Sequence, residues 1–123
     1  MSGGLDASTA LACYSADYFE ARERFRDSAR QTGATLHSHS LSAKGKEGER
    51  LWIDAAVLGR ADAPNTLVLS SGLHGVEAVF GSAVQLAWLK HWSSFVPIGL
   101  RVVLLHALNP FGQVNSRRVN EDN

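Results

Sequence analysis

The chain has 123 residues, of which 45% are hydrophobic and 20% are charged, proportions that are typical of a globular domain and exclude a disordered chain. Twelve lysines and arginines balance twelve aspartates and glutamates, so nothing in the charge indicates a nucleic acid or an anionic membrane as partner. The single cysteine, Cys13, excludes a disulfide framework and a cysteine-rich zinc site.

The N-terminal segment, residues 1–13, is predicted to be loose, because Asp6 interrupts an already weak apolar stretch. It lacks the basic residues that open a secretory signal peptide. No stretch of the chain approaches the ~18 consecutive apolar residues that a membrane helix needs. We therefore expect a soluble, cytoplasmic protein without a membrane partner.

A first helix is predicted from Tyr14, with Ser15 as its N-cap and Gly33 at its end. Its apolar stripe consists of Tyr18, Phe19, Ala21, Phe25 and Ala29. Four arginines alternate with acidic residues around this stripe, which is typical of a solvated helix face. They are Arg22, Arg24, Arg26 and Arg30.

Two strands joined by a polar turn are expected next. The stretch ATLHSHSLS, residues 34–42, alternates with a period of two and places His37 and His39 on one face. KGKEGER, residues 44–50, is a glycine-containing turn, and LWIDAAVLG, residues 51–59, is a second strand. The pattern predicts a β-hairpin.

The second half of the chain has the pattern of a strand, a helix and a strand. TLVLS, residues 66–70, is a short apolar run of the kind found in a buried central strand. A helical pattern covers Val76 to Trp92, and Leu100 to Leu108 is another buried strand. Such a unit implies parallel pairing, so we predict an α/β fold with a mixed parallel and antiparallel sheet flanked by helices. Four strands and two helices would leave one sheet face poorly covered, which indicates the front part of a larger domain.

A histidine and a glutamate lie three residues apart just after the first of these parallel strands. Ligands of open α/β sheets bind beyond the carboxyl ends of the strands, and a spacing of three lets the side chains of His74 and Glu77 converge. Imidazole nitrogen and carboxylate oxygen are ligands that zinc accepts. Gly72 and Gly75 would allow tight turns and the close approach of a ligand. The competing interpretation is that His74 caps the next helix and that Glu77 interacts with its dipole.

Two motifs follow one another in this part of the chain, SGLHGVEAVFGSA at residues 71–83 and LLHALNPFGQVNSRRVNEDN at residues 104–123. In this order they resemble the carboxypeptidase A-like zinc metallopeptidase family, and most of all a bacterial branch of it with poorly defined substrates. The resemblance implies that residues 14–123 are the N-terminal part of one incomplete α/β/α domain of the carboxypeptidase-like, phosphorylase/hydrolase type.

The resemblance also implies roles for individual residues. His74 and Glu77 would be two ligands of one zinc ion. Arg118 matches the arginine that polarises the scissile carbonyl and stabilises the oxyanion, and Arg117 takes this role if the register is shifted by one. Without the resemblance, both arginines would be placed in a solvated loop. Asn109, Pro110 and Gly112 match the turn after the second parallel strand.

Parts of the family's site have no counterpart in these 123 residues. The third zinc ligand, the general-base glutamate and the residues that bind the substrate carboxylate are missing, although a catalytic zinc ion takes three protein ligands. His91 would lie about 25 Å from His74 along the helix, at 1.5 Å per residue. His37 and His39 are expected to be a sheet-face pair. His106 is expected to lie in the core or to support the site from behind, with a hydrogen bond to the backbone. Because a general base contributes roughly 10²–10⁴-fold, we expect no appreciable hydrolysis by this chain alone.

These features favour a zinc-dependent hydrolase of peptide or amide bonds that acts on a peptide. One alternative is an amidohydrolase of the aspartoacylase and succinylglutamate desuccinylase type, which acts on N-acyl amino acids and whose site also begins with an H-G-x-E stretch. The NPFG turn and the RRVNEDN ending favour the carboxypeptidase-like branch. A third possibility is a non-catalytic, truncated remnant that self-associates or binds a partner through an uncovered sheet face.

Overall fold

The computed structural model describes residues 4–122. Its elements are α1 (Ala7–Leu11), α2 (Tyr18–Gln31), β1 (Thr35–Lys44), β2 (Arg50–Leu58), β3 (Asn65–Ser70), the 3₁₀ turn η1 (Gly75–Glu77), α3 (Ala78–His91), the 3₁₀ turn η2 (Ser93–Phe95), β4 (Leu100–His106) and α4 (Pro110–Val114). The strands form one sheet in the order β1-β2-β4-β3. β1 pairs with β2, and β2 with β4, in the antiparallel sense, whereas β3 and β4 are parallel. The predicted hairpin, the parallel strand–helix–strand unit and the mixed α/β sheet are confirmed.

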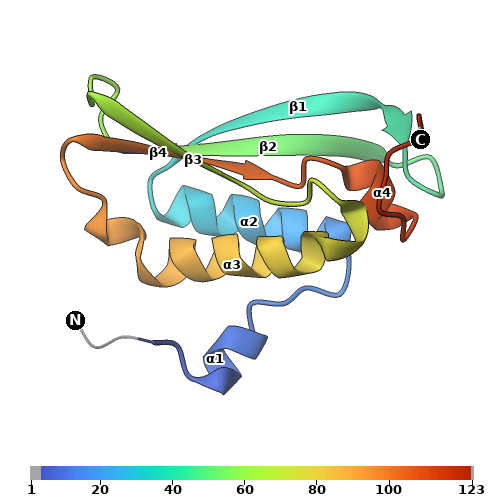
Figure 1. Cartoon of the computed structure of the whole chain (residues 1–123), viewed down its shortest axis with the longest axis horizontal. Coiled ribbons are helices and arrows are strands. Elements are labelled where there is room, and N and C mark those ends of the chain that lie inside the picture. The colour runs from blue at the N-terminus through green and yellow to red at the C-terminus, as the bar shows by residue number, and fades with distance from the viewer. Residues whose placement is uncertain (1–3, 123) are drawn as a thin grey trace.

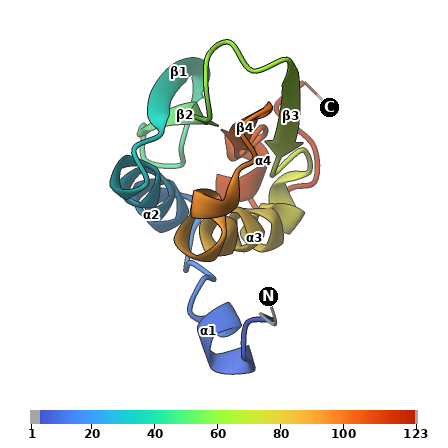
Figure 2. The same ribbon diagram turned by 90° about the vertical axis from the view of Figure 1, so that its left-hand side faces the viewer.

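Both long helices, α2 and α3, lie on the same face of the sheet (Figures 1 and 2). The core between these layers consists of Phe25, Ala29, Ala56, Leu58, Leu89, Val102 and Leu104. Burial of a leucine or phenylalanine side chain of this kind stabilises the fold by about 1.5–3 kcal/mol. Over the opposite face the described residues place no helix, and His37 and His39 lie there on β1, opposite Ala55 and Ile53 of β2.

Helix α2 begins later than predicted. Its N-cap is Asp17, whose side chain accepts a hydrogen bond from the Glu20 backbone N–H at 2.8 Å, so the predicted start at Tyr14 with Ser15 as N-cap is wrong. Arg24 holds this lead-in segment by donating to the Tyr14 carbonyl at 2.8 Å and to the Ser15 hydroxyl at 3.1 Å. Tyr14 and Ser15 therefore lie before the helix and are held by hydrogen bonds from one of its side chains.

Within residues 4–122, strand β3 lies at the edge of the sheet, so its prediction as a central strand is wrong for this part of the fold. All six of its residues are exposed, and Leu67, Val68 and Leu69 have exposed fractions of 44%, 53% and 38%. An apolar run identifies a strand that is suited to burial, but it does not say how many neighbours the strand has. Among the described residues β3 has one neighbour, β4, and β4 is the strand that is central.

The segment predicted to be loose contains the short helix α1, capped by the Asp6 side chain, which accepts from the Thr9 N–H at 2.8 Å. Cys13 is buried after it against Ala83 and Leu86 of α3. Within residues 4–122, no helix combines the length and the apolar character needed to cross a lipid bilayer.

Candidate functional site

The candidate site lies at the carboxyl ends of β3 and β4, where two loops meet. Because the strands are parallel, both loops leave the sheet at the same edge. The Leu108 N–H donates to the Ser71 carbonyl, and the Asn109 N–H to the Gly72 carbonyl, each at 2.8 Å. These hydrogen bonds bring the two motifs, which residues 84–103 separate in the chain, together at one edge of the fold.

His74 and Glu77 converge at this edge. His74 is the N-cap residue of η1 and Glu77 is its last residue. The Nδ1 atom of His74 lies 3.1 Å from Oε2 of Glu77, and the side chains are 37% and 65% exposed. The side chain of His74 makes no capping hydrogen bond, so the cap interpretation does not explain its position.

The donor set of this pair fits two positions of a zinc site. Imidazole nitrogen and carboxylate oxygen are both accepted by zinc, and here they are adjacent and accessible to solvent. Within residues 4–122, no three histidine, cysteine, aspartate or glutamate side chains gather closely enough to hold a metal ion. A catalytic zinc ion takes three protein ligands, and His74 and Glu77 would supply two of them.

The two candidate arginines lie in different surroundings. Arg118 is exposed and lines a hollow of about 480 Å³ together with His74 and Asn109. The guanidinium of Arg117 lies over the ring of Phe111, with its central carbon 5.6 Å from the ring centroid. The structure thus brings Arg118 to the same hollow as His74 and places Arg117 against an aromatic side chain.

Gly75 allows the His74 loop to touch the loop that carries the arginines. A Cβ atom at this position would lie 2.2 Å from the carbonyl carbon of Gly112 and 2.5 Å from the carbonyl oxygen of Arg117. The Gly75 N–H donates to the Arg118 carbonyl at 3.1 Å. The group that approaches Gly75 closely is thus a neighbouring segment of the same chain, whereas the sequence had suggested a ligand there.

The remaining histidines lie apart from this edge or are buried. His37 and His39 are on the uncovered sheet face, and His91 is the last residue of α3, next to Trp92. His106 is fully buried in the core, as predicted, but its expected hydrogen bond to the backbone is wrong, because its partner is a side chain. Its Nε2 is hydrogen-bonded to the Ser82 hydroxyl at 2.8 Å, and its ring stacks on Phe25 with the centroids 4.6 Å apart.

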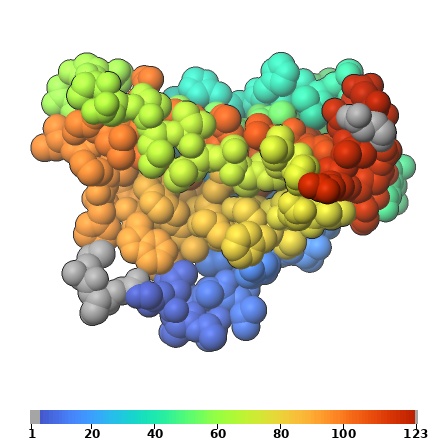
Figure 3. Space-filling view, in the orientation of Figure 1, coloured from blue at the N-terminus to red at the C-terminus, as the bar shows by residue number. Residues whose placement is uncertain are grey.

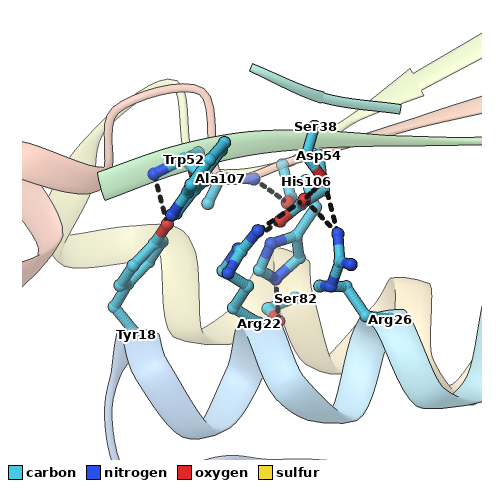
Figure 4. A network of polar contacts seen from close by, with 10 residues as sticks. Tyr18, Arg22, Arg26, Ser38, Trp52, Asp54, Ser82, His106 and Ala107 are labelled. Carbon is cyan, nitrogen blue, oxygen red and sulfur yellow. Dashed lines mark hydrogen bonds and ion pairs between the residues drawn. The ribbon is translucent and has the colours of Figure 1, made fainter. Parts of the chain in front are cut away.

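A buried polar cluster, which the sequence patterns did not identify, lies between α2 and the sheet (Figure 4). Asp54 of β2 is fully buried and accepts hydrogen bonds from Arg22 Nε at 2.7 Å, from Arg26 Nη1 at 3.0 Å and from the Ser38 hydroxyl at 2.5 Å. Arg22 and Arg26 are 22% and 24% exposed, so the prediction of a solvated helix face is wrong for these two residues. Asp54 lies two positions before the inward-facing Ala56 and therefore faces the same side of the sheet. A carboxylate at such an inward position was the signal in the sequence that could have revealed the cluster.

His106 lies opposite Asp54 across β2 and β4 and is included in this cluster, in which two side chains have shifted pKa values. Burial raises the pKa of Asp54, but the hydrogen bonds from Arg22 and Ser38 outweigh it and hold that pKa below the usual range. Burial lowers the pKa of His106 to about 4. At neutral pH the cluster therefore contains an ionised aspartate, two arginines and a neutral histidine.

Tyr18 forms hydrogen bonds with the backbone of β2 just beyond the point where β2 stops pairing with β4. The register of that pairing stops at Asp54 and His106, which leaves the backbone of Trp52 beyond it. The Tyr18 hydroxyl donates to the Trp52 carbonyl at 2.7 Å and accepts from the Trp52 N–H at 2.8 Å. Burial raises the pKa of Tyr18 to about 12, so the hydroxyl keeps its proton for the first of these bonds.

Solved structures share this fold at low sequence identity. A glutaminyl cyclase from Fimbriiglobus ruber matches 86% of this chain and 46% of its own, with 12% identity and a TM-score of 0.59. A Zn-dependent exopeptidase from Parabacteroides distasonis matches 86% of this chain and 47% of its own, with 11% identity and a TM-score of 0.56. A glutaminyl cyclase from Porphyromonas gingivalis has 10% identity and a TM-score of 0.51. The chain thus shares the fold of these three structures, and it spans less than half of their length.

Sequence comparison gives the family. No curated protein matches this chain. The family model described as "Protein of unknown function (DUF2817)" matches residues 14–123, which is nearly the whole chain. The chain therefore belongs to the DUF2817 family.

Proposed function

We propose that residues 14–123 are the N-terminal part of a zinc-dependent hydrolase domain of the metallocarboxypeptidase type, and that His74 and Glu77 are two of its zinc ligands. The observation that carries this proposal is their convergence at the carboxyl end of β3, with a nitrogen and an oxygen 3.1 Å apart. The zinc exopeptidase-like fold supports it, and so does the position of Arg118 in the same hollow.

In this proposal, His74, Glu77 and Arg118 have different roles in the reaction. In such sites a bound zinc ion polarises a carbonyl group and lowers the pKa of a bound water molecule. His74 and Glu77 would hold the ion, and the guanidinium of Arg118 would stabilise the negative charge that develops on the carbonyl oxygen. Arg118 is suited to this role because its side chain is exposed at the hollow, and its carbonyl accepts hydrogen bonds from Gly75 at 3.1 Å and Asn109 at 3.3 Å.

The substrate in this proposal is a peptide that loses its C-terminal residue, with an N-acyl amino acid as the alternative. The hollow next to His74 is lined by both polar and apolar residues, among them Asn109, Phe111 and Val119, and it is compatible with either substrate. A longer member of the family that carries the same residues would separate the two by its relative rates on a peptide and on an N-acyl amino acid. Hydrolysis of the N-acyl amino acid alone would favour the aspartoacylase-like alternative.

Removal of either ligand is expected to weaken zinc binding. The purified chain offers zinc two of the three protein ligands of a complete site. His74→Ala and Glu77→Ala each remove one of these two, so each should lower the zinc affinity of the purified chain about tenfold or more. Zinc titration followed by the NMR signals of the histidine rings measures this. The matched controls are His37→Ala and His39→Ala, on the uncovered sheet face. A zinc response that stays the same in His74→Ala, or that moves with His37 or His39, would contradict the proposal.

A second candidate function is association with another polypeptide, and the surface formed by β3 and α3 favours it. Figure 3 shows the two elements side by side on one face of the molecule. Between them lies a groove of about 610 Å³, lined among others by Leu69, Phe80 and Val84. Phe80 and Val84 are 62% and 51% exposed. A helix that is apolar on both sides, such as α3, is typical of a buried position. We therefore infer that, in the isolated chain, a second copy of the chain covers this surface.

Self-association is therefore expected to depend on this surface. The mass obtained by light scattering should rise with the concentration of the purified chain, and Phe80→Lys should shift the rise to a concentration several-fold higher, because a charge in the groove loses its hydration on association. Leu11→Lys is the matched control, since Leu11 is 69% exposed but lies on α1. A monomer at all concentrations would eliminate this candidate.

A further inference from the structure

We infer that Gln85 and Ser71 are positioning residues for the His74–Glu77 pair. The inference rests on the proposed function, because it gives these two buried polar side chains the task of holding the zinc-binding loop in place. Neither residue belongs to the chemistry of the site. Ser71 is the first residue of the motif at residues 71–83, which gave it no role, and Gln85 lies outside both motifs. Their position follows from the hydrogen bonds that they make.

Gln85 of α3 joins the ends of both parallel strands. It is only 4% exposed. Its Nε2 donates to the carbonyl of Leu69, the next-to-last residue of β3, and to the carbonyl of Leu105 in β4, each at 3.0 Å. Both hydrogens of the amide group are used, so the side chain holds the two strand ends at a set separation where the loops begin.

Ser71 continues this connection into both loops. Its hydroxyl donates to Gln85 Oε1 at 2.8 Å and accepts from the Ala107 N–H at 3.1 Å. Ala107 has a φ of 59°, a backbone conformation that a residue other than glycine adopts only when its surroundings hold it there. The hydrogen bond from its N–H to Ser71 is one of the contacts that hold it.

The helix is close enough for these bonds because Gly81 faces the end of the strand. A Cβ atom at Gly81 would lie 2.9 Å from the Cβ atom of Ser71. Gly81 and Gln85 are four residues apart and so lie on the same face of α3. His74 and Glu77 border the same groove as Ser71, Gly81 and Gln85, which places the anchored residues next to the proposed ligands.

Ligands held by a supporting shell lose affinity when that shell is removed, typically 10–100-fold in metal sites. Gln85→Met keeps the length of the side chain and removes its three hydrogen bonds, and Ser71→Ala removes both bonds of the hydroxyl. The two residues act through one shared hydrogen bond. The double variant should therefore lose less binding free energy for zinc than the sum of the losses in the two single variants. Such a non-additive result is expected for a connected pair and not for two independent packing defects.

The matched control is Ser82→Ala. Ser82 lies on the same helix, is 5% exposed and makes one buried hydrogen bond, to His106, so its loss removes a bond from the core and none from the loops. Any effect that follows from a weaker core alone should appear in this variant as well.

Two measurements on the whole chain test the inference. The first is amide hydrogen exchange without metal, comparing Gly75, Leu108 and Asn109 in the loops with Leu104 in the core strand. In Gln85→Met we expect exchange at the loop amides to accelerate about tenfold more than at the strand, and in Ser82→Ala we expect no such difference. The second is the zinc titration, in which Gln85→Met should bind about tenfold more weakly than Ser82→Ala.

The outcomes separate the inference from the proposed function. Equal acceleration at loop and strand amides in Gln85→Met would overturn the positioning role, whatever the zinc titration shows. Selective acceleration at the loop amides, in a chain whose histidine rings do not respond to zinc, would support the role of Gln85 in holding the loop and reject the zinc site. Selective acceleration together with unchanged zinc affinity would overturn the inference that the anchored loop geometry serves the ligands.

Discussion

Replacement of Asp54 by alanine is expected to destabilise the protein by about 3–5 kcal/mol, because it leaves two arginines in the core without their shared counter-charge. Asp54 has no exposed surface, and it accepts hydrogen bonds from Arg22, Arg26 and Ser38. Arg22 and Arg26 are themselves largely covered. The change in the midpoint of urea-induced unfolding measures the loss. Should the alanine variant fail to fold, Asp54→Asn tests the same charge at nearly constant volume.

The control for this prediction is the exposed ion pair of Arg60 and Asp62. Arg60 donates two hydrogen bonds to Asp62, each at 2.9 Å, but both side chains are about 70% exposed. Solvent screening makes exposed pairs of this kind contribute little, so Asp62→Asn should leave the midpoint nearly unchanged. Equal midpoints for the Asp54 and Asp62 variants would show that the buried cluster does not stabilise the fold.

His106 is expected to make the protein less stable between pH 6.5 and pH 4. The folded chain keeps this side chain neutral, with a pKa of about 4, whereas the unfolded chain takes up the proton near pH 6.5. Below pH 6.5 the unfolded state therefore binds more protons, and the free energy of unfolding falls as the pH falls. The full loss amounts to about 3 kcal/mol and is complete once the pH passes the folded pKa.

The structural cause of this pH dependence is the closed environment of the imidazole. His106 lies against the ring of Phe25 and uses Nε2 for Ser82. Among the described residues, its Nδ1 has no hydrogen-bond partner that would stabilise a second proton. Asp54 favours the charged form of His106 and Arg22 opposes it, but burial is the largest effect.

Urea unfolding at pH 7 and at pH 5 measures the contribution of His106. His106→Gln cannot take up the proton, so its free energy of unfolding should change less between the two pH values than that of the natural chain. His37→Gln, at an exposed position on β1, should keep the full difference. Asp54 affects stability at lower pH than His106 does. Its pKa in the folded chain is below the ordinary value of 3.8, so its contribution to the free energy of unfolding is lost as the pH falls from 3.8 through the folded pKa. An unchanged pH dependence in His106→Gln would contradict the assignment.

Much of the fold could be predicted from periodicity along the chain. Val102, Leu104 and His106 face the helices at every second position of β4, and Tyr18, Ala21, Phe25 and Ala29 form the buried stripe of α2. The pairing of His74 with Glu77 also followed from spacing, since residues three apart at a helix start face one another. These features depend on residues within one turn or a few positions of each other.

The position of β3 and the role of the arginines could not be read in the same way. TLVLS has the composition of a central strand, yet its neighbours on the sheet are decided by the rest of the polypeptide, and the described residues provide one neighbour only. Arg22 and Arg26 follow the pattern of a solvated face, but Asp54 lies 32 and 28 positions further along the chain. The sheet places the Asp54 carboxylate against α2, where Arg22 and Arg26 are half-buried as its partners.

The sequence by itself determined the strands and helices, the parallel unit and the local placement of His74 and Glu77, because each of these rests on short-range periodicity and sterics. Only the tertiary structure decided that β3 has one neighbour within residues 4–122, that Gly75 accommodates the loop of Arg118, and that Gln85 connects the ends of β3 and β4. These features depend on contacts between segments far apart in the chain. Such contacts form when whole layers pack together, and no pattern within one segment specifies them.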